Sequence, residues 1–232
     1  MTEGVFIVQL NGYQDLSAKA RSFELLSLEQ DFHFEPGQFV SMEFELDGQQ
    51  YSRSYSLSSP PGDGRSLEIL VKYNPTGPGS HYLWGMEIGF RFPIKGPHGS
   101  FVLDRAGQDS ILIATGTGIA PLRSMLYTIL QSPSRPSVTL LFGARTEPDL
   151  LYHSEFTELA AKTPNFSYCA VLSQASDGWP GARGYVQDHL DAALTGRNSA
   201  NVYIAGSIEM VKDVRLLLEE KGWDPGRIHF EK

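Results

Sequence analysis

A glycine-rich turn is the first stretch of this chain whose residue types suggest chemistry. In SILIATGTGIAPL, Gly116 and Gly118 allow a sharp turn and bring backbone N–H groups close to a ligand. Pro121 suits a first helical turn, whose N-terminus favours a pyrophosphate. The pattern is not a complete GxGxxG, because Pro121 replaces the third glycine. Such turns also occur without a ligand, so the loop alone leaves both interpretations open.

A second candidate is Arg145, in the Gly143-Ala144-Arg145 sequence that follows the predicted strand Val138–Phe142. Loops at the carboxyl ends of parallel strands border the ligand crevice of such sheets. Arg145 could therefore pair with a ribose phosphate or reach a hydroxyl. A surface arginine bonded to Glu147 or Asp149 is an equal alternative.

The composition argues against several other kinds of site and partner. One cysteine, Cys169, excludes an intrachain disulfide and an iron–sulfur cluster held by this chain, which needs four thiolates. The six histidines show no HExxH or comparable spacing, so we expect no metal. A formal net charge of -8 disfavours nucleic acid and anionic membranes as partners.

The segments that would direct the chain to a membrane are not recognisable. MTEGVFIVQL has no basic region leading into an apolar one, and no apolar run approaches the roughly 18 residues of a membrane span. We therefore expect a cytoplasmic protein, folded almost end to end and monomeric.

A change of periodicity near residue 107 predicts two domains, 1–106 and 107–232, joined within Asp104–Asp109. From Val5 to Leu103, short runs rich in Val, Phe, Tyr and Leu alternate with turn sequences such as Asp47-Gly48. This spacing predicts an N-terminal antiparallel β-barrel. The fold class is thus β followed by α/β.

The second half alternates strand-like runs with amphipathic stretches, which predicts a five-stranded parallel sheet with helices on both faces. Gly222 would form a left-handed cap after the last helix. The predicted strands are Ser110–Ala114, Val138–Phe142, Phe166–Leu172, Asn201–Ala205 and Arg227–Phe230, and the predicted helices are Pro121–Gln131, Tyr152–Lys162, Val186–Leu194 and Ile208–Lys221.

A series of motifs resembles the ferredoxin–NADP reductase superfamily over nearly the whole chain. Any one is weak, but their order and spacing are specific. Because the chain lacks the cysteines for an iron–sulfur cluster, it most resembles flavin reductases and the stand-alone reductases of oxygenase systems. The motifs are RSYSLSS (Arg53–Ser59), GPGS (Gly77–Ser80), KGPHGSF (Lys95–Phe101), GTGIAPLRSM (Gly116–Met125), FGARTEPDLLY (Phe142–Tyr152), WPGARGYV (Trp179–Val186) and YIAGSIEMV (Tyr203–Val211).

The resemblance implies a flavin site in the first domain. Arg53 would bind a flavin phosphate, Tyr55 would lie against the isoalloxazine, and Ser56 would take a catalytic position near flavin N5. The GxxS pattern favours tightly held FAD, with FMN or an exchangeable flavin as alternatives. The residues implied at the flavin are Arg53, Ser54, Tyr55, Ser56, Leu70, Val71, Lys72, Tyr73, Gly77, Gly79 and Ser80.

The resemblance also implies a nicotinamide dinucleotide site in the second domain. Ala205 replaces a cysteine that many relatives carry, and Glu231 matches a C-terminal glutamate that we take as a second catalytic candidate, with no aromatic residue after it. The residues implied at the dinucleotide are Thr115, Gly116, Gly118, Ile119, Ala120, Pro121, Gly143, Arg145, Ser173, Tyr185, Ala205, Gly206 and Met210.

The choice between NADH and NADPH depends on the cations of that site. Members specific for NADPH often carry an arginine after a serine, where this chain has Ser173-Gln174, which favours NADH. Arg145, Arg183 and Tyr185 could still form a phosphate site.

The resemblance implies an FAD-dependent NAD(P)H reductase, in which nicotinamide C4 gives a hydride to flavin N5 and electrons pass to a separate protein such as a ferredoxin or an oxygenase component. One alternative is a flavin reductase whose acceptor is free flavin. The other is a non-catalytic electron-transfer subunit that holds FAD, against which the GTGIAP loop argues.

Overall fold

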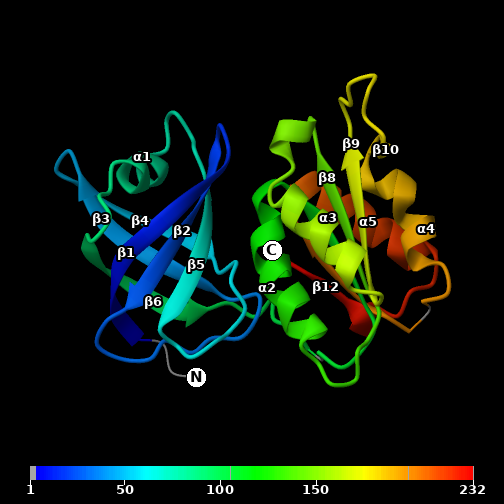
Figure 1. Ribbon diagram of the computed structural model, residues 1–232, viewed down its shortest axis with the longest axis horizontal. Coiled ribbons are helices and arrows are strands. Elements are labelled where there is room, and N and C mark those ends of the chain that lie inside the picture. The colour runs from blue at the N-terminus through cyan, green and yellow to red at the C-terminus, as the bar shows by residue number, and fades with distance from the viewer. Residues whose placement is uncertain (1–3, 105, 198, 232) are drawn as a thin grey trace. The chain divides into compact units, whose positions relative to one another are not determined.

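The computed structural model describes residues 4–104, 106–197 and 199–231, and the chain forms two compact units (Figure 1). One unit extends to Leu103 and includes Arg123–Met125, and the other contains Asp104–Leu122 and the chain from Leu126 onward. The predicted junction Asp104–Asp109 contains Arg105, which lies outside the described residues. A domain boundary after residue 106 stays a prediction.

The first unit is a curled antiparallel sheet, so the predicted β-barrel is confirmed. In the described part of the chain its strand order is β4-β3-β6-β1-β2-β5. A bridge between Leu57 and Ile69 joins the end of β4 to β5 and so links the two edges of the sheet. The strands are β1 (Gly4–Ser17), β2 (Ala20–Ser27), β3 (Phe39–Leu46), β4 (Gln49–Ser56), β5 (Ser66–Lys72) and β6 (Arg91–His98).

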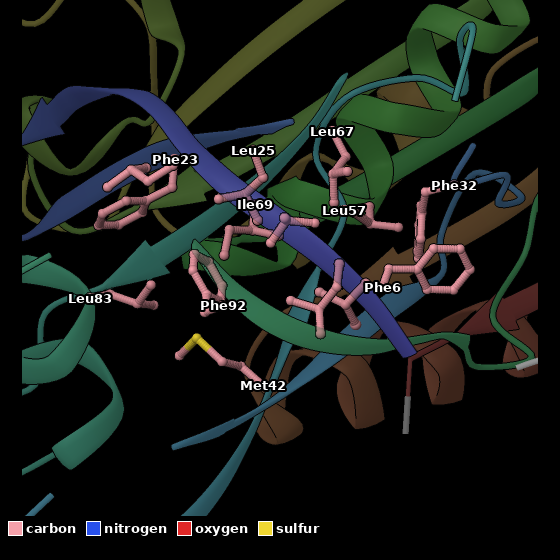
Figure 2. Packing of buried hydrophobic residues seen from close by; sticks show 14 of the residues in the cluster. Phe6, Phe23, Leu25, Phe32, Met42, Leu57, Leu67, Ile69, Leu83 and Phe92 are labelled. Atoms are coloured by element: carbon pink, nitrogen blue, oxygen red, sulfur yellow. The ribbon is translucent and has the colours of Figure 1, made fainter. Parts of the chain in front are cut away.

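The turns and the core of this sheet follow from the sequence pattern. Asp47 and Gly48 both have positive φ, 52° and 75°, which is the backbone of the two-residue hairpin turn that Asp-Gly favours. Alternate residues of the strands point inward, as in Figure 2, where Phe23, Leu25 and Ile69 belong to one buried cluster.

A short helix, α1 (Pro78–Trp84), interrupts the strands of the first unit and was not predicted. Pro78 occupies its first turn, where the missing N–H costs no hydrogen bond. Leu83 is fully buried in the same cluster as the strand residues (Figure 2). The helix therefore covers one end of the barrel core.

The second unit is a parallel sheet with strand order β10-β9-β8-β7-β11-β12 in the residues described. The expectation of five strands was one too low. The additional strand, β10 (Ala182–Arg183), has only two residues, too few to show a period. The others are β7 (Ser110–Thr115), β8 (Val138–Ala144), β9 (Phe166–Leu172), β11 (Asn201–Ala205) and β12 (Ile228–Phe230).

Helices cover both faces of this sheet, as predicted. Val211, Val214 and Leu218 pack on the face that carries Ile111 and Ile113. On the opposite face, Phe156 contacts the ring of Tyr168 at 5.5 Å. The α-helices are α2 (Ile119–Leu130), α3 (His153–Lys162), α4 (Leu190–Leu194) and α5 (Ile208–Glu220), and the 3₁₀ turns are η1 (Gly116–Gly118), η2 (Glu147–Asp149), η3 (Val186–His189) and η4 (Pro225–Arg227).

Two predicted elements differ in form. The helix expected over Val186–Leu194 begins as the 3₁₀ turn η3, because the Asp188 carboxylate accepts a hydrogen bond from the N–H of Tyr185 at 2.7 Å and tightens the first turn. Arg227 belongs to η4 and not to a strand. The predicted cap is confirmed, since Gly222 has a φ of 74°.

In the described ranges, no helix is long and apolar enough to cross a membrane. The same ranges hold no group of three or more His, Cys, Asp or Glu residues that could bind a metal ion.

Candidate functional site

The strand order of the second unit locates a ligand site. From β7 the chain builds outward through β8, β9 and β10, and it then returns to the other side of β7 to form β11 and β12. The order therefore reverses between β7 and β11. In open parallel sheets, ligands bind outside the carboxyl ends of the strands at such a switch point. The loops there are 115–118 and 205–207, and they lead into α2 and α5.

A hydrogen bond joins these two loops. The hydroxyl oxygen of Thr115 accepts the backbone N–H of Ser207 at 3.1 Å, and a Cβ added to Gly206 would overlap the same oxygen. The Ser207 hydroxyl caps α5 by accepting the N–H of Met210 at 3.3 Å. The first turns of α2 and α5 are thus held beside each other, each with N–H groups suited to an anion.

The two glycines of the GTG sequence do different things. A Cβ on Gly118 would overlap the backbone of Ala205, so this glycine lets η1 pack against the end of β11. Gly116 has a φ of 56°, and the space where its Cβ would lie is open. The sequence assigned both glycines to close approach of a ligand, and that assignment stays a prediction for both. Ile119, Ala120 and Pro121 are buried in the first turn of α2.

The carboxyl end of β8 brings the next predicted residues together. A Cβ on Gly143 would lie 2.8 Å from Cγ1 of Val186, so the chain after Tyr185 crosses this strand end. The N–H of Ser173 donates to the carbonyl of Ala144 at 3.0 Å. The ring of Tyr185 is 65% exposed. Tyr185 and Ser173 are therefore placed at the edge that carries Arg145.

Arg145 itself is exposed, and the alternative partner Asp149 has another role. The Asp149 carboxylate accepts the N–H of Thr146 at 3.2 Å and its hydroxyl at 2.7 Å, which closes the turn η2. The Arg145 carbonyl accepts the N–H of Gln174 at 2.8 Å. Its backbone is therefore fixed, and its side chain lies at the surface of the site.

The end of β12 places Glu231 beside this switch point. The N–H of Glu231 donates to the carbonyl of Ile204, the residue before Ala205, at 3.0 Å. The ring of Phe230 packs against the apolar core and lies 3.8 Å below the guanidinium of Arg215. Phe230 is thus held within the second unit, and Glu231 follows at the sheet edge.

In the first unit, two motifs distant in sequence come together. A Cβ on Gly79 would overlap the hydroxyl of Tyr55 and lie 2.8 Å from Cγ of Arg53, so the GPGS loop packs directly on the RSYS strand. Burial raises the pKa of Tyr55 to about 12, against the opposing effect of Arg53. Tyr55 is therefore a neutral hydroxyl donor at physiological pH, beside a cation.

The hydroxyl of Ser80 shapes the loop before α1. It accepts the N–H of Asn74 at 3.0 Å and lies 3.0 Å from the carbonyl oxygens of Asn74 and Gly77. The sequence assigned this hydroxyl to a phosphate, whereas here it bonds to the protein backbone. These bonds fix the loop around Gly77, and a contact of the Ser80 hydroxyl with a phosphate stays a prediction.

The end of β5 lines a surface pocket of about 420 Å³. Leu70 and Val71 are buried, Lys72 is exposed, and the Tyr73 hydroxyl lies 3.3 Å from Nε2 of His81. Sequence reasoning missed Lys19, which the pairing of Ala20 with Lys72 brings to the pocket. Ser54 and Ser56 flank Tyr55 on β4. The pocket is lined by Lys19, Lys72, Tyr73, Asn74 and Pro75.

These residues fit the two expected ligands. In the first unit, Arg53 beside Gly79 and, separately, the two lysines of the pocket offer cations suited to the phosphates of a flavin. The open space at Gly116 and the paired helix N-termini suit a dinucleotide pyrophosphate.

Comparison with known proteins identifies one domain family in each half of the chain. Residues 8–103 match the oxidoreductase FAD-binding domain family, and residues 112–216 match the oxidoreductase NAD-binding domain family. The chain is 36% identical to a ferredoxin–NADP reductase B of Sorangium cellulosum, over 87% of this chain and 86% of that protein. It is 33% identical to the anthranilate 1,2-dioxygenase electron transfer component of Acinetobacter baylyi, over 86% of this chain but only 58% of that protein.

A solved structure shares the whole architecture. The FAD/NAD-binding domain of a nitric oxide dioxygenase from Vibrio cholerae superimposes with a TM-score of 0.86, at 25% identity and over 97% of both chains. An antiparallel flavin-type barrel followed by a parallel sheet with glycine turns at its switch point defines a two-domain, FAD-dependent NAD(P)H oxidoreductase. The chain belongs to the ferredoxin–NADP reductase superfamily.

Proposed function

We propose that this protein takes electrons from NADH or NADPH and delivers them, through tightly held FAD, to a separate protein such as a ferredoxin or an oxygenase component. The observation that carries the proposal is the open space at Gly116 beside the helix starts of the sheet switch point, in a chain that also holds an FAD-type barrel. The names of the two relatives, a ferredoxin–NADP reductase and a dioxygenase electron transfer component, support this class of acceptor.

In this proposal the first unit binds and orients the flavin. Arg53 pairs with a flavin phosphate, and the Tyr55 ring excludes water while its neutral hydroxyl donates a hydrogen bond. Ser56, at the end of β4, is the proposed donor near the reactive nitrogen. When bound, FAD accepts a hydride and passes its electrons on singly or in pairs.

The second unit binds and orients the dinucleotide. The N–H groups at the starts of α2 and α5 hold the pyrophosphate, and the exposed ring of Tyr185 offers a stacking face. Ala205, Gly206 and Glu231 lie at the strand ends where the nicotinamide would be held. Alignment and exclusion of water are the contributions that hydride transfer requires from the protein. We also propose a cytoplasmic monomer.

The identity of the electron acceptor distinguishes the proposed reductase from a flavin reductase. The purified protein is loaded with FAD, passed through gel filtration, reduced anaerobically with NADH, and mixed with either a plant-type [2Fe–2S] ferredoxin or free FMN. We expect FAD to stay bound and to be reoxidised by the ferredoxin. Loss of all flavin in the column, with rapid reduction of added FMN, would establish the flavin reductase instead.

A further inference from the structure

The exposed residue Arg183 donates through its guanidinium to several backbone carbonyls of the loop that follows β9. Its Nη1 donates to Ala175 at 3.2 Å, and its Nη2 donates to Ser176, Asp177 and Trp179 at 2.7, 3.2 and 3.3 Å. An arginine has five N–H donors in a planar fork and accepts no hydrogen bond. The two Nη groups of Arg183 are therefore directed toward the loop and bonded to its carbonyls.

The same loop is fastened from its other side. The indole N–H of Trp179 donates to the carbonyl of Ala182 at 3.0 Å, and the ring packs 5.7 Å from that of His153. The carbonyl of Arg183 is in turn 2.8 Å from Nε2 of His189. The segment 173–181 thus leaves β9 and returns beside it as β10, and Arg183 of β10 bonds back to its carbonyls.

Arg183 also stands just before Tyr185 in the chain. The N–H of Gly184 donates to the carbonyl of Leu172 at 3.0 Å, and the N–H of Tyr185 is held by Asp188. The backbone leading to the exposed Tyr185 ring is therefore held by its own contacts, and Arg183 joins it directly to the loop 173–181.

A role as phosphate ligand conflicts with this arrangement. For its Nη atoms to reach a ribose phosphate, the guanidinium would have to abandon the carbonyls of Ala175, Ser176, Asp177 and Trp179, which would lose a charge-assisted donor. Arg145 has no such commitment of its side chain among the described contacts, and it lies at the same strand edge.

We propose that Arg183 is a positioning residue, which fixes the loop 173–181 beside the site for any nicotinamide dinucleotide and does not contact the 2′-phosphate of NADPH. The proposal rests on the dinucleotide-binding function proposed above. Arg145, which the sequence already makes a candidate for that phosphate, serves as the comparison.

The test compares Arg183→Ala, Arg183→Lys and Arg145→Ala with the unchanged protein by two measurements. The first is amide hydrogen exchange of residues 174–185 without any ligand. The second is the dissociation constants of NAD⁺ and NADP⁺ by calorimetry. Exchange reports the clamp directly, because it measures opening of the loop and needs no dinucleotide.

Arg183→Ala is expected to accelerate exchange in 174–185 by about tenfold or more, which corresponds to loss of one charge-assisted hydrogen bond. Any weakening of dinucleotide binding should be equal for NAD⁺ and NADP⁺, because the clamp acts on the loop and not on the 2′-phosphate. Arg183→Lys should not restore protection, because an ammonium is a point charge without the planar fork. Arg145→Ala should leave exchange unchanged and weaken NADP⁺ more than NAD⁺.

Unchanged exchange in Arg183→Ala would overturn the clamp. A loss of NADP⁺ affinity about tenfold greater than that of NAD⁺ in the same variant would return Arg183 to the phosphate site. If the unchanged protein bound neither dinucleotide, the proposed function and the assignment of Arg145 would fail, while the exchange result would still decide the role of Arg183 in the loop.

Discussion

The hydroxyl oxygen of Thr115 accepts the backbone N–H of Ser207 across a distance of 3.1 Å. Thr115 ends the strand β7, and Ser207 begins the helix α5 on the other side of the switch point. This side chain therefore ties together the two loops that are expected to hold the dinucleotide. Its removal is the simplest perturbation of the site.

Thr115→Val keeps the side-chain shape but leaves the N–H of Ser207 without this acceptor. We expect a loss of about 1 kcal/mol in the free energy of unfolding and several-fold weaker NAD⁺ binding, measured by denaturant titration and calorimetry. Thr139→Val is the matched control, because the buried Thr139 hydroxyl has no partner among the described residues. That variant should be neutral or slightly stabilising. If Thr115→Val and Thr139→Val lost the same amount of unfolding free energy and NAD⁺ affinity, the hydrogen bond from Ser207 to Thr115 would have no special role.

Gly116→Ala and Gly118→Ala separate backbone strain from packing. The first places a Cβ in open space at a φ of 56°, which costs about 1 kcal/mol. The second forces a Cβ against the backbone of Ala205, at a cost of about 1 to 3 kcal/mol. Thermal unfolding should therefore show the larger loss for Gly118→Ala. Weaker dinucleotide binding beyond the stability effect should appear in Gly116→Ala, whose open space a pyrophosphate would fill; unchanged affinity there would count against this placement of the ligand.

Arg53→Ala should weaken FAD binding without unfolding the barrel. The side chain is exposed, and its Nη1 donates to the carbonyl of the neighbouring Ser52 at 2.7 Å. Loss of a charge-assisted phosphate contact predicts an increase in the dissociation constant of about tenfold or more, measured by fluorescence quenching of FAD. Arg91→Ala, on β6 and bonded to Gln9, is the control and should retain normal affinity. Equal affinities in the two variants would refute the assignment of Arg53.

The pH dependence of stability should carry a contribution from His229. Burial lowers the pKa of its imidazole, which stacks on Tyr203 at 4.7 Å, although Asp104 acts in the opposite direction. Because the unfolded chain then binds a proton more readily than the folded one, stability is present above the ordinary pKa of about 6.5 and is lost as pH falls through the lower folded value. His229→Phe keeps a stacked ring and should flatten the fall in unfolding free energy between about pH 7 and pH 5; an unchanged slope would exclude this origin.

Much of the fold could be predicted from the sequence because its elements leave periodic traces. The strands of the second unit are long apolar runs, and Asp47-Gly48 marks a hairpin turn by its conformational preference. The helix α1 has seven residues and is stabilised by burial of Leu83, which is a tertiary contact with no local signal. The strand β10 is too short for any period and exists through its pairing with Val171 and Leu172.

The site was less predictable than the fold, because its contacts join residues far apart in the chain. The motifs indicated that Gly118 was required, but its reason is the backbone of Ala205, which no spacing reveals. Ser80 and Arg183 carry groups suited to phosphates, and in the folded chain both are bonded to backbone carbonyls. The residue types therefore indicated which side chains could bind a phosphate, and only the fold shows which groups those side chains contact.

The central claim, that one chain holds FAD and reduces it with a nicotinamide dinucleotide, is tested most directly by anaerobic titration of the purified, FAD-loaded protein. The flavin absorbance would be followed while NADH and NADPH are added in separate experiments. We predict that the flavin band survives gel filtration and bleaches within seconds of adding at least one of the two. A protein that retains FAD but is not bleached by either would contradict the account and would establish an electron-transfer subunit without dinucleotide chemistry.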